Sequence, residues 1–272
     1  MHRRAGWGLL FVLVFAGCAT GPAVLERVYV PEGGASVRVD VTRPGGRALA
    51  GWFVERMGAG EVVREVLGRS REVFLVRGDG GWFVWCVGGF PGTLWRLGLG
   101  VEGWERGGVL DYPGVGEVEW FEGKDGGGVV LVGRAAVGYA EQGWEGVRWR
   151  EVREVFAWPT RDAEVVWDAG AVPVVGTLAG MERVRWWGVE EEGVWEHGMR
   201  WEYGEGVSAR GVRALLRLVL PGMFAAVFER DFLDTWNALE FTEEGGALGV
   251  RLPVVSQGEL ERALAGWFGW GE

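Results

Sequence analysis

The chain has 272 residues, with 38 acidic and 28 basic side chains, so its formal net charge is −10. A chain this acidic has no electrostatic footprint for nucleic acid, and an anionic lipid surface would repel it. Its 50 glycines and 18 tryptophans reflect codon bias as much as selection, because both residues have G-rich codons. The match Gly98-x-Gly100-x-x-Gly103 to a dinucleotide fingerprint is therefore set aside.

The first 17 residues have the organisation of a secretory signal. Arg3 and Arg4 are basic, and the apolar stretch 7–16 is too short to cross a hydrocarbon core about 30 Å thick. The stretch ends in Phe15-Ala16-Gly17-Cys18, which resembles the lipobox of bacterial lipoproteins, with Phe15 where Leu is usual. The resemblance implies cleavage before Cys18 and acylation of that cysteine, with palmitate among the attached chains. The alternative is an ordinary secretory signal with a cysteine near its end by chance.

Lipidation makes the membrane the expected partner of Cys18. Two or three acyl chains anchor a protein stably, at about 0.8 kcal/mol per buried methylene. Loss of Arg3 and Arg4 with the signal changes the net charge from −10 to −12 (−10 − 2), so attachment depends on lipid and not on a basic patch. Ala19 after the cysteine favours the periplasmic face of the outer membrane over the inner membrane. Residues 18–35 then hold the lipidated cysteine and its tether.

Cys86 is the remaining cysteine. With Cys18 lipidated, no disulfide can form within the mature chain. Cys86 lies in the apolar run 82–87, so we expect a buried thiol that packs as a small hydrophobic side chain.

Residues 36–205 have the pattern of an antiparallel β domain. Alternating valines predict a strand over 37–41, and residues 43–46 and 48–57 are interpreted as a turn and the next strand. Two hairpins and a further strand are predicted, over 72–77 with 82–87, 117–122 with 129–132, and 147–158. Over 195–203, alternate residues share one face: Trp195, His197, Met199, Trp201 and Tyr203.

Residues 206–272 have helical spacing. Ser208 is predicted to cap a helix that Pro221 ends, and 222–236 to form a second helix. A strand over 252–255 precedes a capping box, Ser256-Gln257-Gly258-Glu259, and another helix. The predicted fold is mainly β (α+β). It is an antiparallel meander, sandwich or half-open barrel, with two or three C-terminal helices packed on it as part of the same domain.

The sequence contains no clear catalytic motif. The mature chain has one histidine, His197, which cannot build a multi-histidine metal site, and no serine lies in a nucleophile motif. Asp231, Asp234 and the run 190–192 contain paired carboxylates, which a glycoside hydrolase requires, but a solvated face or a turn explains them more simply. We expect no catalytic residue, no metal and no cofactor.

The aromatic side chains are the better indication of a ligand. We predict a binding face for an acyl chain or a glycan, formed by Trp186, Trp195, His197, Trp201 and Tyr203. A core in which Trp replaces Ile and Leu is the alternative. The segment 71–85, REVFLVRGDGGWFVW, resembles a hairpin of LolA/LolB-like half-barrel carriers, which implies an apolar cavity that shields acyl chains.

The sequence thus predicts a membrane-anchored envelope lipoprotein that is a non-enzymatic binding or carrier module for an apolar ligand. Two alternatives stay open, an envelope glycan hydrolase with paired carboxylates and a structural or assembly partner.

The lipobox is tested by the substitution Cys18→Ala. We expect the precursor to stay unlipidated and uncut, because the lipoprotein peptidase requires the acylated cysteine. Metabolic labelling with a palmitate analogue and the mobility of the precursor measure both effects. Normal processing and unchanged membrane fractionation would show that the signal is an ordinary secretory one.

Overall fold

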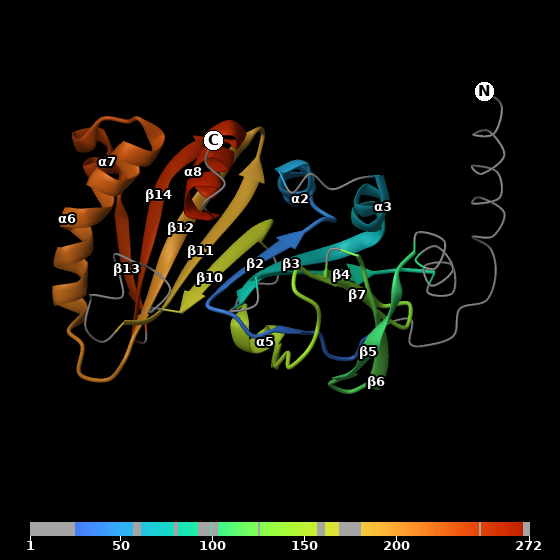
Figure 1. Ribbon diagram of the computed structural model, residues 1–272. Helices are drawn as coiled ribbons and strands as arrows, with labels where there is room; N and C mark the ends of the chain where they lie inside the picture. The colour runs from blue at the N-terminus through green and yellow to red at the C-terminus, as the bar shows by residue number, and fades with distance from the viewer. Residues whose placement is uncertain are drawn as a thin grey trace, which may run out of the picture. The chain divides into compact units, whose positions relative to one another are not determined.

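The computed structural model describes residues 25–56, 61–78, 81–91, 99, 103–124, 126–156, 161–168, 181–244 and 246–268. Antiparallel strands are its commonest element, and helices follow them in the last quarter of the chain (Figure 1). The prediction of a mainly β, α+β chain with an open antiparallel sheet and C-terminal helices is confirmed. Cys18 and its tether up to residue 24 lie outside the described residues.

Groups of strands alternate with helices along the chain. The strands are β1 (Tyr29–Pro31), β2 (Ala35–Asp40), β3 (Ser70–Gly78), β4 (Gly81–Gly88), β5 (Glu105–Tyr112), β6 (Gly116–Glu122), β7 (Gly128–Val132), β8 (Ala136–Ala140), β9 (Trp149–Glu151), β10 (Ala163–Asp168), β11 (Met181–Glu191), β12 (Val194–Tyr203), β13 (Glu240–Glu244) and β14 (Ala247–Ser256). The helices are α2 (Pro44–Arg56), α3 (Glu61–Arg69), α5 (Val152–Val155), α6 (Ala209–Phe228), α7 (Phe232–Ala238) and α8 (Gln257–Phe268).

The chain divides into two compact units. The first comprises residues 1–33 and 65–154, and the second comprises residues 34–64 and 155–272. The helical segment after residue 206 therefore belongs to the same unit as β10, β11 and β12, whereas most of the strands before residue 150 form the other unit.

The first unit has the strand order β3-β4-β8-β7-β6-β5, and each neighbouring pair is antiparallel. The two predicted hairpins are confirmed as β3–β4 and β6–β7. A separate short ladder pairs β1 with β9, with Tyr29 opposite Glu151 and Pro31 opposite Trp149.

Aromatic rings fill the core of the first unit. Trp85 stacks on Tyr112, with ring centroids 5.3 Å apart, and meets Trp144 and Trp149 edge to face. Trp144 and Trp149 stack on each other at 5.9 Å. Gly138 on β8 lies opposite Trp85 in the ladder, and a Cβ there would overlap the Trp85 ring. Glycine therefore makes room for the large ring.

The second unit has the strand order β13-β14-β12-β11-β10-β2, again with antiparallel neighbours. The predicted strands over 37–41 and 195–203 are confirmed as β2 and β12, and that over 252–255 lies within β14. Helix α2 packs on β2 and β11, and α6, α7 and α8 pack on β14.

Both predicted helix caps are present. The Gly211 N–H donates to Ser208 Oγ at 3.3 Å, which caps α6. The capping box of α8 is complete, because Ser256 N–H donates to Glu259 Oε2 at 2.7 Å and Glu259 N–H donates to Ser256 Oγ at 3.3 Å.

The predicted turn and strand over 43–57 are wrong, because residues 44–56 form α2; Met57 lies outside the described residues. The glycines that indicated a turn are required by packing. A Cβ at Gly45 would overlap Glu190, and one at Gly46 would overlap the backbone of Asp40. Leu49, Ala50 and Phe53 are buried at helical spacing, and Pro44 occupies the first helical position.

Two boundaries also differ from the prediction. Pro221 lies inside α6 and does not end it. Proline removes one helical hydrogen bond, and the burial of Leu220, Pro221 and Phe224 offsets that loss. The strand predicted over 147–158 is limited to β9, because its partner β1 is three residues long. Helix α5 follows it.

The packing of Trp85 on Gly138 predicts opposite effects for two Gly→Ala substitutions. Gly138→Ala should lower the free energy of unfolding by about 1–3 kcal/mol, because the added methyl overpacks the core. Gly51→Ala in α2 is the control, since a Cβ at Gly51 meets nothing within 4 Å. It should raise stability by about 0.5–1 kcal/mol. Urea denaturation measures both, and equal effects would contradict the packing argument.

Candidate functional site

The predicted ligand-binding residues lie in the core of the second unit. Trp186 of β11 is buried, and so are Trp195, His197 and Trp201 of β12. Tyr203, at the end of β12, is half-buried. Helix α6 covers His197, whose ring lies 5.7 Å from that of Phe224 and 6.2 Å from that of Phe228. A ligand would reach the His197 ring only if α6 moved away from the sheet.

Both ring nitrogens of His197 have partners. The Trp186 Nε1–H donates to His197 Nδ1 at 3.0 Å, and His197 Nε2 lies 2.8 Å from the carbonyl oxygen of Pro253. This pattern requires a neutral ring that carries its proton on Nε2. His197 therefore ties β11 and β14 together beneath α6.

Burial lowers the pKa of His197 from 6.5 to about 4. The hydrogen bond to Pro253 acts in the opposite direction, and the charge of Arg230 lowers the pKa further. A neutral imidazole with both nitrogens engaged cannot exchange a proton with a bound substrate without breaking a hydrogen bond. The geometry thus assigns His197 to packing and not to acid–base chemistry.

One member of each acidic group that the sequence singled out has a structural partner. Asp231 is the N-cap of α7, and its carboxylate accepts from the N–H groups of Leu233 and Asp234 at 2.8 and 3.2 Å. Glu190 Oε1 accepts from Gly193 N–H at 2.6 Å in the turn between β11 and β12. These carboxylates shape a helix end and a turn.

A buried ion cluster lies on the polar face of the second unit's sheet. Arg185 Nε donates to Glu202 Oε1 at 2.7 Å, and Arg185 Nη1 lies 3.5 Å from Glu164 Oε1. The same guanidinium donates to the carbonyl oxygen of Val155. Because Arg185 compensates both carboxylates and Glu164 is buried, the cluster lacks the two accessible acids that glycoside hydrolysis needs.

Cys86 is buried, as predicted, and burial raises the pKa of its thiol to about 12. The thiol is therefore protonated and unreactive at neutral pH. Among the residues that the structure describes, no group of three or more His, Cys, Asp or Glu side chains is arranged to hold a metal ion.

The feature that stands out as a binding site is an apolar surface on α6 and α7. Large apolar side chains, which are usually buried, are exposed on these two helices. The helices adjoin each other, because a Cβ at Gly222 of α6 would touch the Phe232 ring of α7. We call this the α6–α7 surface. It consists of Leu218 (67% exposed), Met223 (39%), Val227 (38%), Phe232 (42%) and Leu233 (65%).

The sequence predicted these helices but not the exposure of this surface. The signal was present, because no charged residue occurs from Leu218 to Phe228. A helical stretch that is apolar all round is either fully buried or meets an apolar environment. By length and composition α6 could cross a membrane, and no other helix among the described residues meets that test, but a core helix has the same properties.

Comparison with known proteins supports the fold alone. No family model matches the chain, and no curated protein matches it. Solved structures of similar fold include three crystal forms of TP0453. Form I has a TM-score of 0.53 at 10% identity, covering 87% of this chain and 94% of that chain. Form III has a TM-score of 0.51 at 10% identity, covering 87% of this chain and 95% of that chain. Form IV has a TM-score of 0.51 at 9% identity, covering 92% of this chain and 98% of that chain.

The buried neutral His197 predicts a pH dependence of stability. Its pKa is about 4 in the folded chain and 6.5 in the unfolded chain, so the unfolded chain binds more protons between these values. Stability should therefore be complete above pH 6.5 and fall as the pH drops towards 4, by about 3 kcal/mol. His197→Gln keeps an amide donor and acceptor and should flatten this slope. Urea midpoints at several pH values measure it, and parallel slopes for both proteins would refute the assignment.

Proposed function

We propose that the chain is a non-enzymatic envelope lipoprotein, anchored through Cys18, whose α6–α7 surface binds acyl chains at the bilayer surface. The observation that carries the proposal is the exposure of five large apolar side chains on two adjoining helices. Exposed apolar side chains that gather on adjoining helices mark contacts with a membrane or a partner.

The energy available from this surface is substantial. Full burial of a side chain such as Leu, Met or Phe contributes about 1.5–3 kcal/mol. Since these five side chains are 38–67% exposed, their transfer into acyl chains would contribute about 4–7 kcal/mol. That is enough for reversible binding and too little for permanent attachment, which the lipid on Cys18 would supply.

The charges on α6 fit a helix that lies at a membrane surface. Its first half carries Arg210, Arg213 and Arg217, whereas its second half carries no charge. Arg213 and Arg217 lie over the Phe241 ring, at 5.6 and 5.3 Å from its centroid. Basic residues beside an apolar face are the pattern of interfacial helices, in which lipid phosphates neutralise the arginines.

The anchor and the surface would act together. Ten residues lie between Cys18 and Tyr29 of β1, so the eleven steps along the chain (29 − 18) span at most about 40 Å. A tethered surface binds as an intramolecular event, at an effective concentration far above that of free protein. Ala19 favours the periplasmic face of the outer membrane as the site of anchoring.

The shared fold is compatible with this proposal. The chain resembles the crystal forms of TP0453 at 10% identity, and a likeness at that level shows the fold alone. Of the carboxylates that the sequence suggested for a glycan hydrolase, Glu190 holds a turn and Asp231 caps a helix, which favours the non-enzymatic function.

The proposal is tested by flotation with vesicles of phosphatidylethanolamine and phosphatidylglycerol. The chain from Ala19 onward, which lacks the lipid, should float with the vesicles. The double substitution Leu218→Asp and Leu233→Asp should reduce the bound fraction at least about tenfold, because two charges must then be desolvated.

Val109→Asp is the matched control, since Val109 is 47% exposed on β5 of the first unit. It should leave flotation unchanged. Failure of the unsubstituted chain to float, or equal flotation of the double variant, would reject lipid binding. If the same double substitution abolished self-association or a protein complex and left flotation intact, the α6–α7 surface would be an assembly interface.

A further inference from the structure

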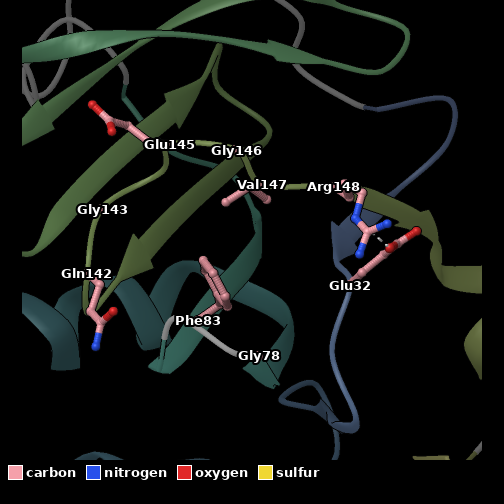
Figure 2. A pocket seen from close by; sticks show the side chains of 9 residues that line it. All are labelled: Glu32, Gly78, Phe83, Gln142, Gly143, Glu145, Gly146, Val147 and Arg148. Carbon is pink, nitrogen blue, oxygen red and sulfur yellow. Dashed lines mark ion pairs between the residues drawn. The ribbon is translucent and has the colours of Figure 1, made fainter.

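The connection from β8 to β9, residues 141–148, separates two hollows on the first unit. The first, the polar hollow, has a volume of about 250 Å³ and is lined by Glu32, Phe83, Gln142 and Arg148 among others (Figure 2). The second, the tryptophan hollow, has a volume of about 340 Å³. Glu145, Gly146 and Val147 line both. One short loop therefore forms a wall of two adjoining sites.

The core holds this loop in place. Trp144 turns inward from the loop, its Nε1–H donates to the carbonyl oxygen of Gly128 at 2.9 Å, and its ring stacks on Trp149. Gly143 and Gly146 have φ values of 81° and 69°, which side chains other than glycine rarely adopt. The hollows are thus preformed, and a ligand would not have to order the loop.

The polar hollow presents both donors and acceptors. Arg148 Nε lies 3.3 Å from Glu32 Oε2, and the pair lies on the far side of Phe83 from Gln142 in the view of Figure 2. A carboxylate accepts, a guanidinium donates, and the amide of Gln142 does both. The Phe83 ring supplies an apolar floor between them.

The tryptophan hollow is lined by the half-buried Trp149 ring, two largely buried indoles and carboxylates. Trp120, Trp144 and Trp149 line it, with Asp111 and Glu145 at its walls. Indole rings pack against the C–H faces of sugar rings, and carboxylates accept hydrogen bonds from their hydroxyl groups.

We propose that the 141–148 loop forms a binding site for a glycan chain, with one sugar ring in each hollow. A hydroxyl group donates and accepts at once, and so it matches the mixture of donors and acceptors in the polar hollow. A cationic ligand would use acceptors alone and would leave Arg148 and the amide nitrogen of Gln142 without a role. One face of Trp149 is also occupied by Trp144, so the rings do not form a cage around a cation.

The size of the site agrees with this ligand class. Sites that enclose a whole drug-sized molecule measure about 300–1,000 Å³. Hollows of about 250 and 340 Å³ that share a wall suit successive rings of a chain better than a single compact ligand. The inference is independent of lipid binding, because every residue that it uses lies in the first unit.

The experiment uses the full lipidated chain in micelles of a polyoxyethylene detergent, which contains no sugar. The tetramer of N-acetylglucosamine is titrated by calorimetry, and choline chloride is titrated in parallel as a cationic probe. We expect saturable binding of the tetramer. Gln142→Ala combined with Glu145→Ala should weaken the binding of the tetramer about tenfold, because the loss of one or two hydrogen bonds lowers affinity by about that factor.

Both substituted side chains are exposed, so the fold should be unaffected. Glu122→Ala is the matched control, since Glu122 is an exposed carboxylate of β6 outside both hollows. Absence of tetramer binding, equal affinity in the double variant, or binding of choline instead of the tetramer would overturn the proposal. None of these outcomes bears on flotation with vesicles, which depends on Leu218 and Leu233.

Discussion

Both units depend on indole rings that lie over glycines of the same strand or of its neighbour. Trp85 covers Gly138 in the first unit, and in the second unit a Cβ at Gly188 would come within 2.7 Å of Trp186 and 2.8 Å of Trp195. A large ring beside a residue without a side chain fills the volume of two ordinary residues. The abundance of glycine and tryptophan in the chain therefore serves core packing and also reflects codon bias.

This packing decides where ligands can bind. The core aromatics that resemble a binding face in sequence are occupied with one another, with glycine backbone and, at His197, with hydrogen bonds. The remaining candidate sites for ligand binding lie on the α6–α7 surface and around the 141–148 loop. The two sites have different chemistry, apolar in one unit and polar with aromatic rings in the other, and they are separately testable.

The sequence predicts what local patterns determine. Alternating valines and Gly-rich turns identify β2, β3–β4 and β6–β7, and Ser208 and Ser256 identify two helix caps. It misses α2, because Gly45 and Gly46 are explained by contacts with residues distant in sequence. The exposure of Leu218 depends in the same way on which segments cover α6. The hollows combine residues from 32 to 149, so no spacing in the sequence reveals them.

The short ladder of β1 on β9 has a mechanical consequence. If Cys18 carries the lipid, a lateral force on the anchor enters the fold around Val28 and Tyr29, since the Val152 N–H donates to the Val28 carbonyl at 2.9 Å. The Tyr29 N–H donates to Tyr112 Oη at 2.9 Å, the Tyr112 hydroxyl donates back to the Tyr29 carbonyl at 3.1 Å, and Trp149 of β9 packs on Tyr112 at 5.0 Å. The load therefore reaches the aromatic core at the first residue of the ladder. Traction on the membrane would strain the same ring cluster that shapes the wall of the tryptophan hollow.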